Sequence, residues 1–321
     1  MTPMSTSGAR IRLGISSCLL GQKVRFDGNH KLDNFLSGTL GQFFEWVPVC
    51  PEVAIGLGVA RPPIRLAGSV SAPRAVGVKD ASVDVTEKLA AYGKQQARRL
   101  DDLSGYVFKS RSPSCGMECV KVYQQAGVPA KSGRGIYADA FLAGQPWLPA
   151  EEEGRLGDPR LRENFIERVF VYHRWQMLAS QGLTAARLVE FHTRHKLALM
   201  AHDVGAYRAL GRLVARAGRR HQKETGREYL IHLMQAFQRL ATRSRHANVL
   251  MHLMGHLKKQ LDAADKAELL EAIHAYRRGE VPFAAPLTLL RHHFRRHPDP
   301  YIAGQTYLNP DPRELLLRGG L

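Results

Sequence analysis

Three cysteines in the first half of the chain lie just after short β-prone segments. Cys18, Cys50 and Cys115 occupy loops that follow residues 11–15, 46–49 and 106–108. In an open parallel sheet the carboxyl ends of the strands meet at one edge, and ligands bind there. We therefore expect three thiolates to converge on one pocket, where they can hold a metal ion or an iron–sulfur cluster.

For each cysteine the alternative is a buried apolar side chain, the commonest state of a free thiol. The dipeptide Cys50-Pro51 and the Ser-Cys-Gly sequence at residues 114–116 favour turns over the interior of a strand or helix. The chain has no paired C-x-x-C motif of a structural zinc site. Cys119, four residues after Cys115, could close a four-ligand structural centre, whereas three ligands leave one iron of a cluster open.

Small and polar residues surround these cysteines. Glycines let the backbone approach a ligand closely, and serine hydroxyls can hydrogen-bond to sulfur or to a substrate. The glycines are Gly21, Gly28 and Gly116, and the serines are Ser16, Ser17, Ser112 and Ser114. We take Ser112 as a candidate substrate-binding residue.

The segments that must position these loops indicate an α/β domain with a parallel sheet. A capping-box pattern from Asp84 to Glu87 and an apolar face over residues 85–103 predict a helix between the second and third strands. Strand, helix and strand in this order are typical of a parallel sheet. We expect this α/β domain to cover residues 1–150.

The second half of the chain has a helical pattern. Apolar residues recur at helical spacing from about residue 161 to residue 297, and Thr184 and Asp262 are predicted helix starts. This pattern predicts an all-α bundle of about six helices. We expect the all-α domain to cover residues 151–321.

A Pro- and Gly-rich stretch separates the two patterns. It runs over residues 144–159 and surrounds the acidic run Glu151, Glu152 and Glu153. Such a composition predicts a link without regular structure, so we place the domain boundary near Ala150.

The charge of the 321-residue chain favours anionic partners. Its 46 Lys and Arg outnumber 29 Asp and Glu, and a net charge of +17 attracts polyanions and phosphorylated small molecules. Four cysteines are too few for a disulfide scaffold in a chain of this length. The sequence contains neither a membrane-length apolar run nor a secretory signal, so we expect a soluble, cytoplasmic protein without membrane contact.

Four motifs in the first half resemble those of the thiouracil desulfidase family, TudS. In chain order they are residues 16–21 (SSCLLG), 24–28 (VRFDG), 49–52 (VCPE) and 109–116 (KSRSPSCG). Four motifs in one order are far more specific than a single glycine pattern. The second half, from about Leu161 to the YLNP sequence at residues 307–310, resembles the YbgA family, a helical domain often fused to the first.

The first resemblance implies a redox-neutral desulfuration. The desulfidase family removes sulfur from thiolated uracils with a 4Fe-4S cluster on three cysteines, which matching motif by motif places at Cys18, Cys50 and Cys115, with Cys119 outside the pattern. The unligated iron suits a soft thiocarbonyl sulfur. Water then attacks the ring carbon and hydrosulfide leaves, so that thiouracil, 4-thiouridine or a thiouridine nucleotide becomes the uracil form.

The same resemblance implies that Glu52 is the general acid/base and Ser110 the second catalytic residue. By position alone, Glu52 could equally be a first-turn residue of the following helix. Arg25, Asp27 and Gly28 form a turn-like segment in which Arg25 suits a substrate phosphate. Because Asp-Gly is also an ordinary turn dipeptide, substrate binding by this segment is a hypothesis.

The helical half indicates no catalytic chemistry of its own. His252 and His256 share a helix face, but no third metal ligand is evident, and we expect the histidines to be structural. Contact with RNA is a hypothesis for this basic domain, and a dimerization element or a lid are its alternatives. The arginines that suit phosphate contacts are Arg216, Arg219, Arg220, Arg239, Arg243 and Arg245.

A second function, from a different class, stays open. The same cysteines could hold a structural zinc ion or cluster in a protein that binds nucleic acid. Metal analysis distinguishes the two functions, because stoichiometric zinc would favour the binding protein and iron the desulfidase.

Overall fold

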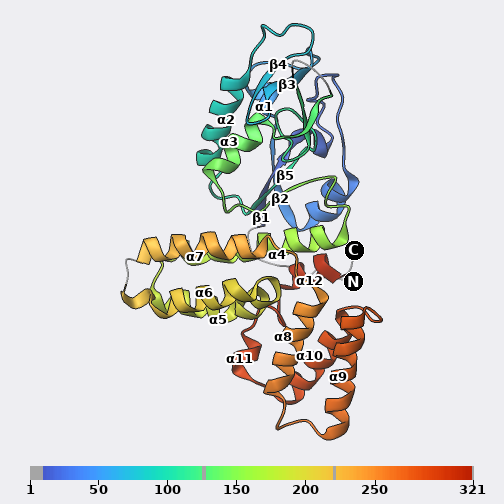
Figure 1. Ribbon diagram of the computed structural model, residues 1–321, viewed down its shortest axis with the longest axis vertical. Helices are drawn as coiled ribbons and strands as arrows, with labels where there is room; N and C mark the ends of the chain where they lie inside the picture. Colours follow the sequence, from blue (N-terminus) through green and yellow to red (C-terminus); the bar gives the residue numbers. More distant parts are fainter. Residues whose placement is uncertain (1–9, 125–127, 220–221, 320–321) are drawn as a thin grey trace. The chain divides into compact units, whose positions relative to one another are not determined.

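The computed structural model describes residues 10–124, 128–219 and 222–319. The chain forms two compact units that divide between Phe165 and Ile166 (Figure 1). The boundary indicated by the sequence, near Ala150, instead lies at the start of a strand of the first unit. The link without regular structure that we expected over residues 144–159 is therefore wrong for residues 150–152.

The centre of the first unit is a parallel sheet of four strands in the order β2-β1-β5-β8. Each neighbouring pair in it is parallel, which confirms the predicted sheet. Ser16 pairs with Val49, and Phe108 pairs with Glu152, so the four carboxyl ends lie at one edge. The strands are β1 (Ile11–Ser16), β2 (Phe44–Val49), β5 (Gly105–Phe108) and β8 (Ala150–Glu152).

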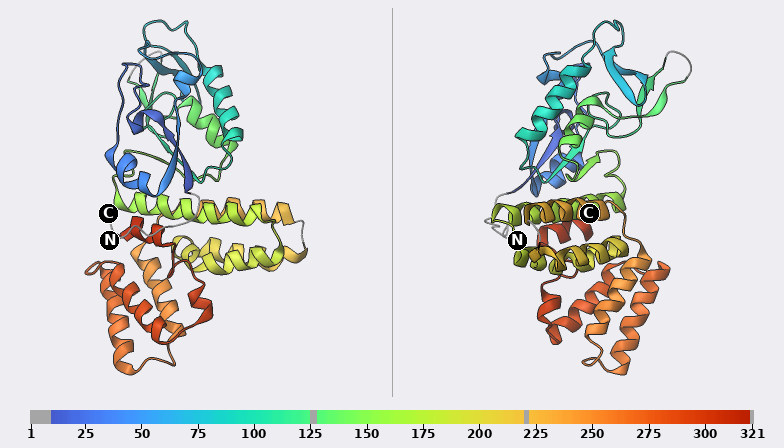
Figure 2. Two further views of the ribbon diagram at one scale, coloured as in Figure 1. Left: turned by 180° about the vertical axis from the view of Figure 1, so that it is seen from behind. Right: turned by 60° about the vertical axis from the view of Figure 1, so that its left-hand side comes forward.

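Two helices pack together beside this sheet, and Figure 2 shows them side by side. They are α2 (Thr86–Arg99) and α3 (Ile136–Gly144). A Cβ atom on Gly93 would lie 2.8 Å from the carbonyl oxygen of Tyr137, so glycine permits this close approach. The predicted helix is confirmed, but Asp84 accepts from the Thr86 amide, at 2.9 Å, instead of forming the predicted capping box.

A stack of aromatic rings fills the space between the sheet and these helices. Tyr106 and Phe108 of β5 stack with their ring centroids 3.9 Å apart, and both contact Phe141 of α3. A Cβ atom on Gly14 of β1 would lie 2.3 Å from the Tyr106 ring. The rings are fully buried, so they fix the ends of β1 and β5 rigidly.

A second sheet, which the sequence did not predict, completes the first unit. Its strand order is β4-β3-β6-β7, with β3 and β6 parallel between two antiparallel edges. The strands are β3 (Ile64–Ser69), β4 (Ala72–Gly77), β6 (Val120–Tyr123) and β7 (Ala130–Gly133). Four short helical turns flank β1 and β2. The turn η1 (Ser17–Leu20) follows β1, η2 (Phe35–Thr39) and η3 (Leu40–Gln42) precede β2, and α1 (Pro51–Ala54) follows β2.

The second unit is helical in its described residues, as predicted. Helices α5, α6 and α7 pack against one another, as do α8, α9 and α10. In the described part of residues 159–296 there are seven α-helices, where about six were expected, and a short 3-10 turn, η4 (Ala217–Arg219), precedes α7. The helices are α4 (Pro159–Ser180), α5 (Ala185–His202), α6 (Val204–Ala215), α7 (Gln222–Phe237), α8 (Arg243–His256), α9 (Ala263–Arg278), α10 (Ala284–Arg296), α11 (Pro300–Ala303) and α12 (Pro312–Gly319).

Side-chain caps explain where two of these helices begin. Thr184 accepts from the amide of Arg187 at the start of α5, and Asp262 accepts from the amide of Asp265 at the start of α9. Both are the helix starts that the sequence predicted. Among the described residues, no helix combines the length and the apolar character needed to span a bilayer.

Two buried histidines of α5 should make the second unit sensitive to acid. Burial lowers the pKa of His192 to about 4 and that of His195 to about 3. In the unfolded chain both titrate near pH 6.5, so below that pH the unfolded state binds protons that the folded state does not. Each histidine then costs about 1 to 2 kcal/mol of stability at about pH 5, and none above about pH 7.

Denaturant unfolding at about pH 7.5 and about pH 5 measures this loss. His195→Gln should reduce the difference between the two pH values, whereas His232→Gln, at an exposed position of α7, should leave it unchanged. A wild-type stability that does not fall between these pH values would contradict the assignment.

Candidate active site

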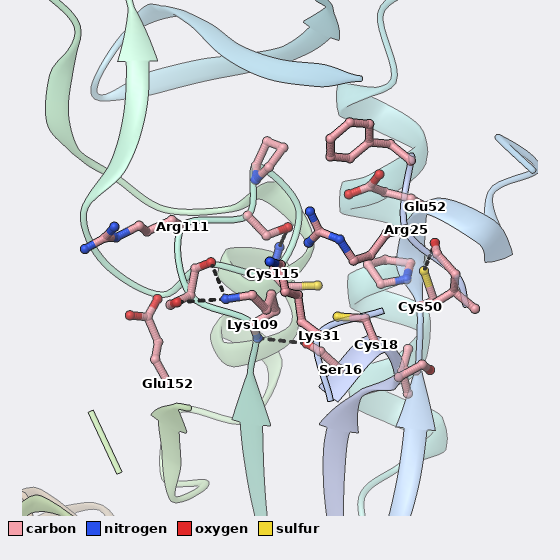
Figure 3. Close-up of a pocket in the computed structure, with 18 of the residues that line it drawn as sticks. Ser16, Cys18, Arg25, Lys31, Cys50, Glu52, Lys109, Arg111, Cys115 and Glu152 are labelled. Atoms are coloured by element: carbon pink, nitrogen blue, oxygen red, sulfur yellow. Dashed lines mark hydrogen bonds between the residues drawn. The ribbon is translucent and has the colours of Figure 1, made fainter. Parts of the chain in front are cut away.

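A cavity of about 690 Å³ opens at the carboxyl edge of the parallel sheet (Figure 3). Loops after β1, β2 and β5 and the segment after β8 all contribute to its wall. The cavity is the place where a parallel sheet is expected to bind a ligand. Of the residues predicted for the site, it is lined by Cys18, Cys50, Cys115, Glu52, Ser110, Ser112 and Arg25.

The thiols of Cys18, Cys50 and Cys115 come together in this cavity. Cys18 lies in the turn η1 after β1, Cys50 directly precedes α1, and Cys115 lies in the loop after β5. Each of the three interacts electrostatically with at least one of the others. Figure 3 shows their side chains next to one another, close to Arg25 and Glu52.

Burial holds these thiols in their protonated form when nothing is bound. It raises the pKa of Cys18 to about 11, although the positive charges of Lys109 and Arg25 act in the opposite direction. Burial also raises the pKa of Cys50 and, further, that of Cys115. Thiolates at these positions therefore need a cationic partner that replaces the protons.

Ser112 organises the loop that carries Cys115. Its hydroxyl oxygen accepts from the amides of Ser114, at 3.3 Å, and Cys115, at 3.1 Å. The loop also packs against Gly135, where a Cβ atom would lie 2.5 Å from the Ser114 carbonyl. Ser112 thus lines the cavity, as predicted for a substrate contact, while its hydroxyl already supports the backbone.

Cys119 differs from the other three cysteines. It lines the outer part of the same cavity, but its side chain is exposed and its φ is +56°. A positive φ is uncommon for a residue with a side chain, and Arg111, in the same loop region, also has one, at +58°. The loop after β5 is thus held in an unusual conformation at both sides of Cys115.

Glu52 lies in the first turn of α1, and two partners hold its carboxylate in place. Arg61 donates to its Oε2 from Nε, at 3.0 Å, and from Nη2, at 2.7 Å. Ser114 donates to its Oε1 at 2.8 Å. Arg61 also donates to the carbonyls of Val24 and Gly58, so a buried guanidinium ties the carboxylate to the first cysteine loop region. Two guanidinium nitrogens on one carboxylate oxygen, with Ser114 on the other, fix the orientation of the carboxylate and pair its charge.

Ser110 belongs to a second polar cluster at the same edge. Glu153 accepts from the hydroxyl and from the amide of Ser110, each at 2.7 Å, and pairs with the ammonium of Lys109. The Lys109 amide in turn donates to the Ser16 hydroxyl, at 2.9 Å, and so joins the ends of β5 and β1. The cluster draws on three of the four parallel strands.

Arg25, Asp27 and Gly28 form a turn, and only Arg25 among them lines the cavity. The Gly28 amide donates to the Arg25 carbonyl, and Gly28 has a φ of +72°. Asp27 accepts from the Asn29 amide, at 3.1 Å, and this hydrogen bond lowers its pKa. Asp27 and Gly28 therefore shape the turn that presents Arg25.

Sequence reasoning missed several polar residues of the site. Arg61, Lys109, Lys31, Glu152 and Glu153 lie in or next to the cavity without having been singled out. Lys109 stands inside a quoted motif directly before Ser110, which was a usable signal. The acidic run was interpreted as a link because proline and glycine flank it, which hid the short strand β8.

Several histidines and arginines of the second unit have structural partners. His256 interacts with Asp299 at 3.2 Å, Arg239 pairs with Asp203 at 2.5 Å, and Arg245 donates to the His202 carbonyl at 2.7 Å. Arg220 lies outside the described residues. Within the described parts of both units, no three side chains of His, Cys, Asp or Glu lie close enough together to bind a single metal ion.

Comparison with known proteins assigns both parts of the chain. Residues 13–153 match the family model of 2-thiouracil desulfurase, and residues 196–312 match that of a protein of unknown function, DUF1722. The uncharacterized protein YbgA of Escherichia coli (strain K12) is 34% identical over 163 residues, which cover 50% of this chain and 95% of YbgA. The chain belongs to the YbgA family and carries a 2-thiouracil desulfurase domain.

A solved structure is also similar to the desulfurase domain. It is described as the 4Fe-4S-dependent thiouracil desulfidase TudS, and it is 28% identical in sequence. The match covers 46% of this chain and 94% of that one, with a TM-score of 0.37. The cavity, with its three cysteines, lies within the residues that match the desulfurase family model, apart from Gly154 and Arg155 at its rim.

Proposed function

We propose that this chain is an iron–sulfur-dependent desulfidase that converts a thiolated uracil, or its nucleotide, to the uracil form. Water replaces the sulfur, which leaves as hydrosulfide, so the reaction needs no external electron donor or acceptor. The observation that carries the proposal is the convergence of Cys18, Cys50 and Cys115 with Glu52 in one cavity of a 2-thiouracil desulfurase domain.

The donor set fits a cluster held by Cys18, Cys50 and Cys115. Two buried thiols and one half-buried thiol supply soft ligands, and the positive charges of Lys109 and Arg25 favour the thiolate of Cys18. A cluster of several irons is wider than one ion, so its ligands lie further apart than the donors around a single metal. When bound, the cluster would supply an iron without a protein ligand as Lewis acid for the thiocarbonyl sulfur.

In this proposal Glu52 acts on the water that attacks the ring carbon. Its carboxylate lines the cavity, and Arg61 and Ser114 hold it in one orientation. An oriented carboxylate can take a proton from the attacking water and pass it to the departing sulfur, which leaves as hydrosulfide. Ser110, which also lines the cavity, is the second catalytic residue of the proposal and contacts the pyrimidine.

Arg25 favours a substrate that carries phosphate. Arg25 and Lys31 both line the cavity, and arginine binds phosphate oxygens through charge-assisted hydrogen bonds. A cavity of about 690 Å³ is within the range that accommodates a whole small ligand such as a nucleotide. We therefore expect 4-thiouridine monophosphate to have a lower KM than free thiouracil.

Anaerobic reconstitution followed by a sulfide-release assay tests the function. The protein should bind about four irons per chain and show broad visible absorption from sulfur-to-iron charge transfer. It should then release sulfide from thiouracil, 4-thiouridine and 4-thiouridine monophosphate, compared in parallel. Stoichiometric zinc, or an iron-loaded protein that releases no sulfide from any of the three, would contradict the proposal.

A further inference from the structure

The register between β5 and β8 places a carboxylate beside the proposed catalytic serine. Phe108 at the end of β5 pairs with Glu152 at the end of β8, and the Glu153 amide continues the pairing by donating to the Phe108 carbonyl, at 3.3 Å. Glu153 therefore stands next to Lys109 and Ser110, although it is 43 residues away from Ser110 in sequence.

The hydrogen-bonding chemistry of this cluster fixes the direction of the Ser110 hydroxyl. A carboxylate only accepts, so the 2.7 Å contact between Ser110 Oγ and Glu153 Oε1 requires the serine to donate its one hydroxyl hydrogen. An ammonium only donates, so the 3.0 Å contact between Lys109 Nζ and Ser110 Oγ takes one of the two lone pairs of the hydroxyl oxygen.

Lys109 has no hydrogen left for a substrate. Its ammonium carries three hydrogens and has three acceptors, namely Ser110 Oγ, the Ser110 carbonyl at 3.2 Å, and Glu153 Oε1. The side chains of Lys109 and Glu153 are only 18% and 12% exposed, so water competes little for these contacts. Lys109 therefore orients Ser110 instead of donating a hydrogen bond to a bound molecule, and Glu153 is not among the residues that line the cavity.

We propose that Glu153 and Lys109 are positioning residues that make Ser110 a hydrogen-bond acceptor for a ring N–H of the thiolated pyrimidine. This inference rests on the proposed function, because it concerns the substrate of the same cavity. One lone pair of Ser110 Oγ stays available, and the residue lines the cavity. Uracil and its thio forms carry an N–H at ring position 3 also when position 1 bears a ribose, so this group is the donor that every candidate substrate shares.

Binding of the reaction product tests the inference without the desulfuration chemistry. The reconstituted protein is titrated by calorimetry with uridine monophosphate and with its N3-methyl derivative. The wild type should bind the unmethylated nucleotide about tenfold more tightly, as expected for one hydrogen bond of about 1 kcal/mol with additional crowding by the methyl group. Ser110→Ala, which removes only the oxygen, should bring the two affinities to within about twofold.

Glutamine variants of Glu151 and Glu153 distinguish the positioning of Ser110 from the mere loss of a carboxylate charge near the cavity. Glu153→Gln loses the second acceptor oxygen and should lower the ratio of the two affinities in the same way. Glu151→Gln removes a carboxylate whose contacts include Arg155 and the Glu152 amide, and it should keep the wild-type ratio. Because the ratio compares two ligands on one protein sample, it does not depend on the fraction of each variant that folds.

The outcomes distinguish this inference from the proposed function. A wild-type ratio near one, a ratio unchanged in Ser110→Ala or Glu153→Gln, or a ratio lost in Glu151→Gln would overturn the positioning roles. In each of these cases sulfide release from 4-thiouridine monophosphate by the wild type would still support the desulfidase. An iron-loaded wild type that releases no sulfide while discriminating the two nucleotides tenfold would instead overturn the proposed reaction and leave Ser110 as an acceptor in a nucleotide site.

Discussion

Replacing Cys18, Cys50 or Cys115 by alanine is expected to remove the iron from the protein almost completely. Cys18 and Cys115 are buried, Cys50 is half-buried, and all three line the same cavity, so each substitution leaves only two ligands for the cluster. Iron and acid-labile sulfide per chain, measured after anaerobic reconstitution, should fall from about four to near zero. Sulfide release from thiouracil should disappear with them.

Cys119→Ser is the matched control for these three variants. Cys119 lines the same cavity but is exposed, and it is not among the main influences on the pKa values of the other three thiols. The serine variant should therefore keep the iron content and the activity of the wild type. Iron retained in any of the three alanine variants, or lost from Cys119→Ser, would refute the ligand assignment.

Glu52→Gln is expected to keep the iron and to lower the rate of sulfide release by a factor of about 10² to 10⁴, the usual contribution of a general acid/base. Glutamine has the shape of glutamate, its one amide oxygen can still accept from Arg61, and its amide nitrogen can donate to the Ser114 hydroxyl oxygen, but it cannot take a proton from water. Alanine is a less specific substitution here. It would leave the guanidinium of Arg61, with a side chain that is 5% exposed, without its carboxylate partner.

Glu45→Gln controls for the loss of a carboxylate from the same sheet. Glu45 lies on β2, is largely exposed, and pairs with Arg12 away from the cavity. Its replacement should change neither iron content nor turnover, since exposed ion pairs contribute little. Wild-type turnover in Glu52→Gln would remove Glu52 from the mechanism, whereas the loss of iron in that variant would give it a structural role instead.

The sequence predicts those residues of the site that come directly after one strand, because their position depends on that strand alone. A β-prone segment followed by a cysteine marks the carboxyl end of a strand, and three such segments were enough to place Cys18, Cys50 and Cys115 at one edge of a parallel sheet. Thr184 and Asp262 marked helix starts for a similar reason, because a cap is a local interaction within a few residues.

The supporting contacts could not be predicted, because they depend on which strands become neighbours. Glu153 meets Ser110 only because β8 pairs with β5, and β8 is three residues long with a charged side chain at two of them. Glutamates 151 and 152 are buried all the same, since Arg155 and the amides of Met117 and Glu118 provide their partners. The β-propensity of glutamate is low because it reflects an average, mostly exposed environment, whereas these two glutamates are buried with polar partners.

The order of the strands along the chain has a consequence for biosynthesis. The cavity wall begins at Ser16 and ends at Arg155, and β8, which closes the row of parallel strands, is the last of them to leave the ribosome. A nascent chain that has exposed its three cysteines still lacks Glu153, the anchor of Lys109 and Ser110. The pocket is therefore complete only after Arg155 has left the ribosome, and a fully formed pocket can receive the proposed cluster only from that point.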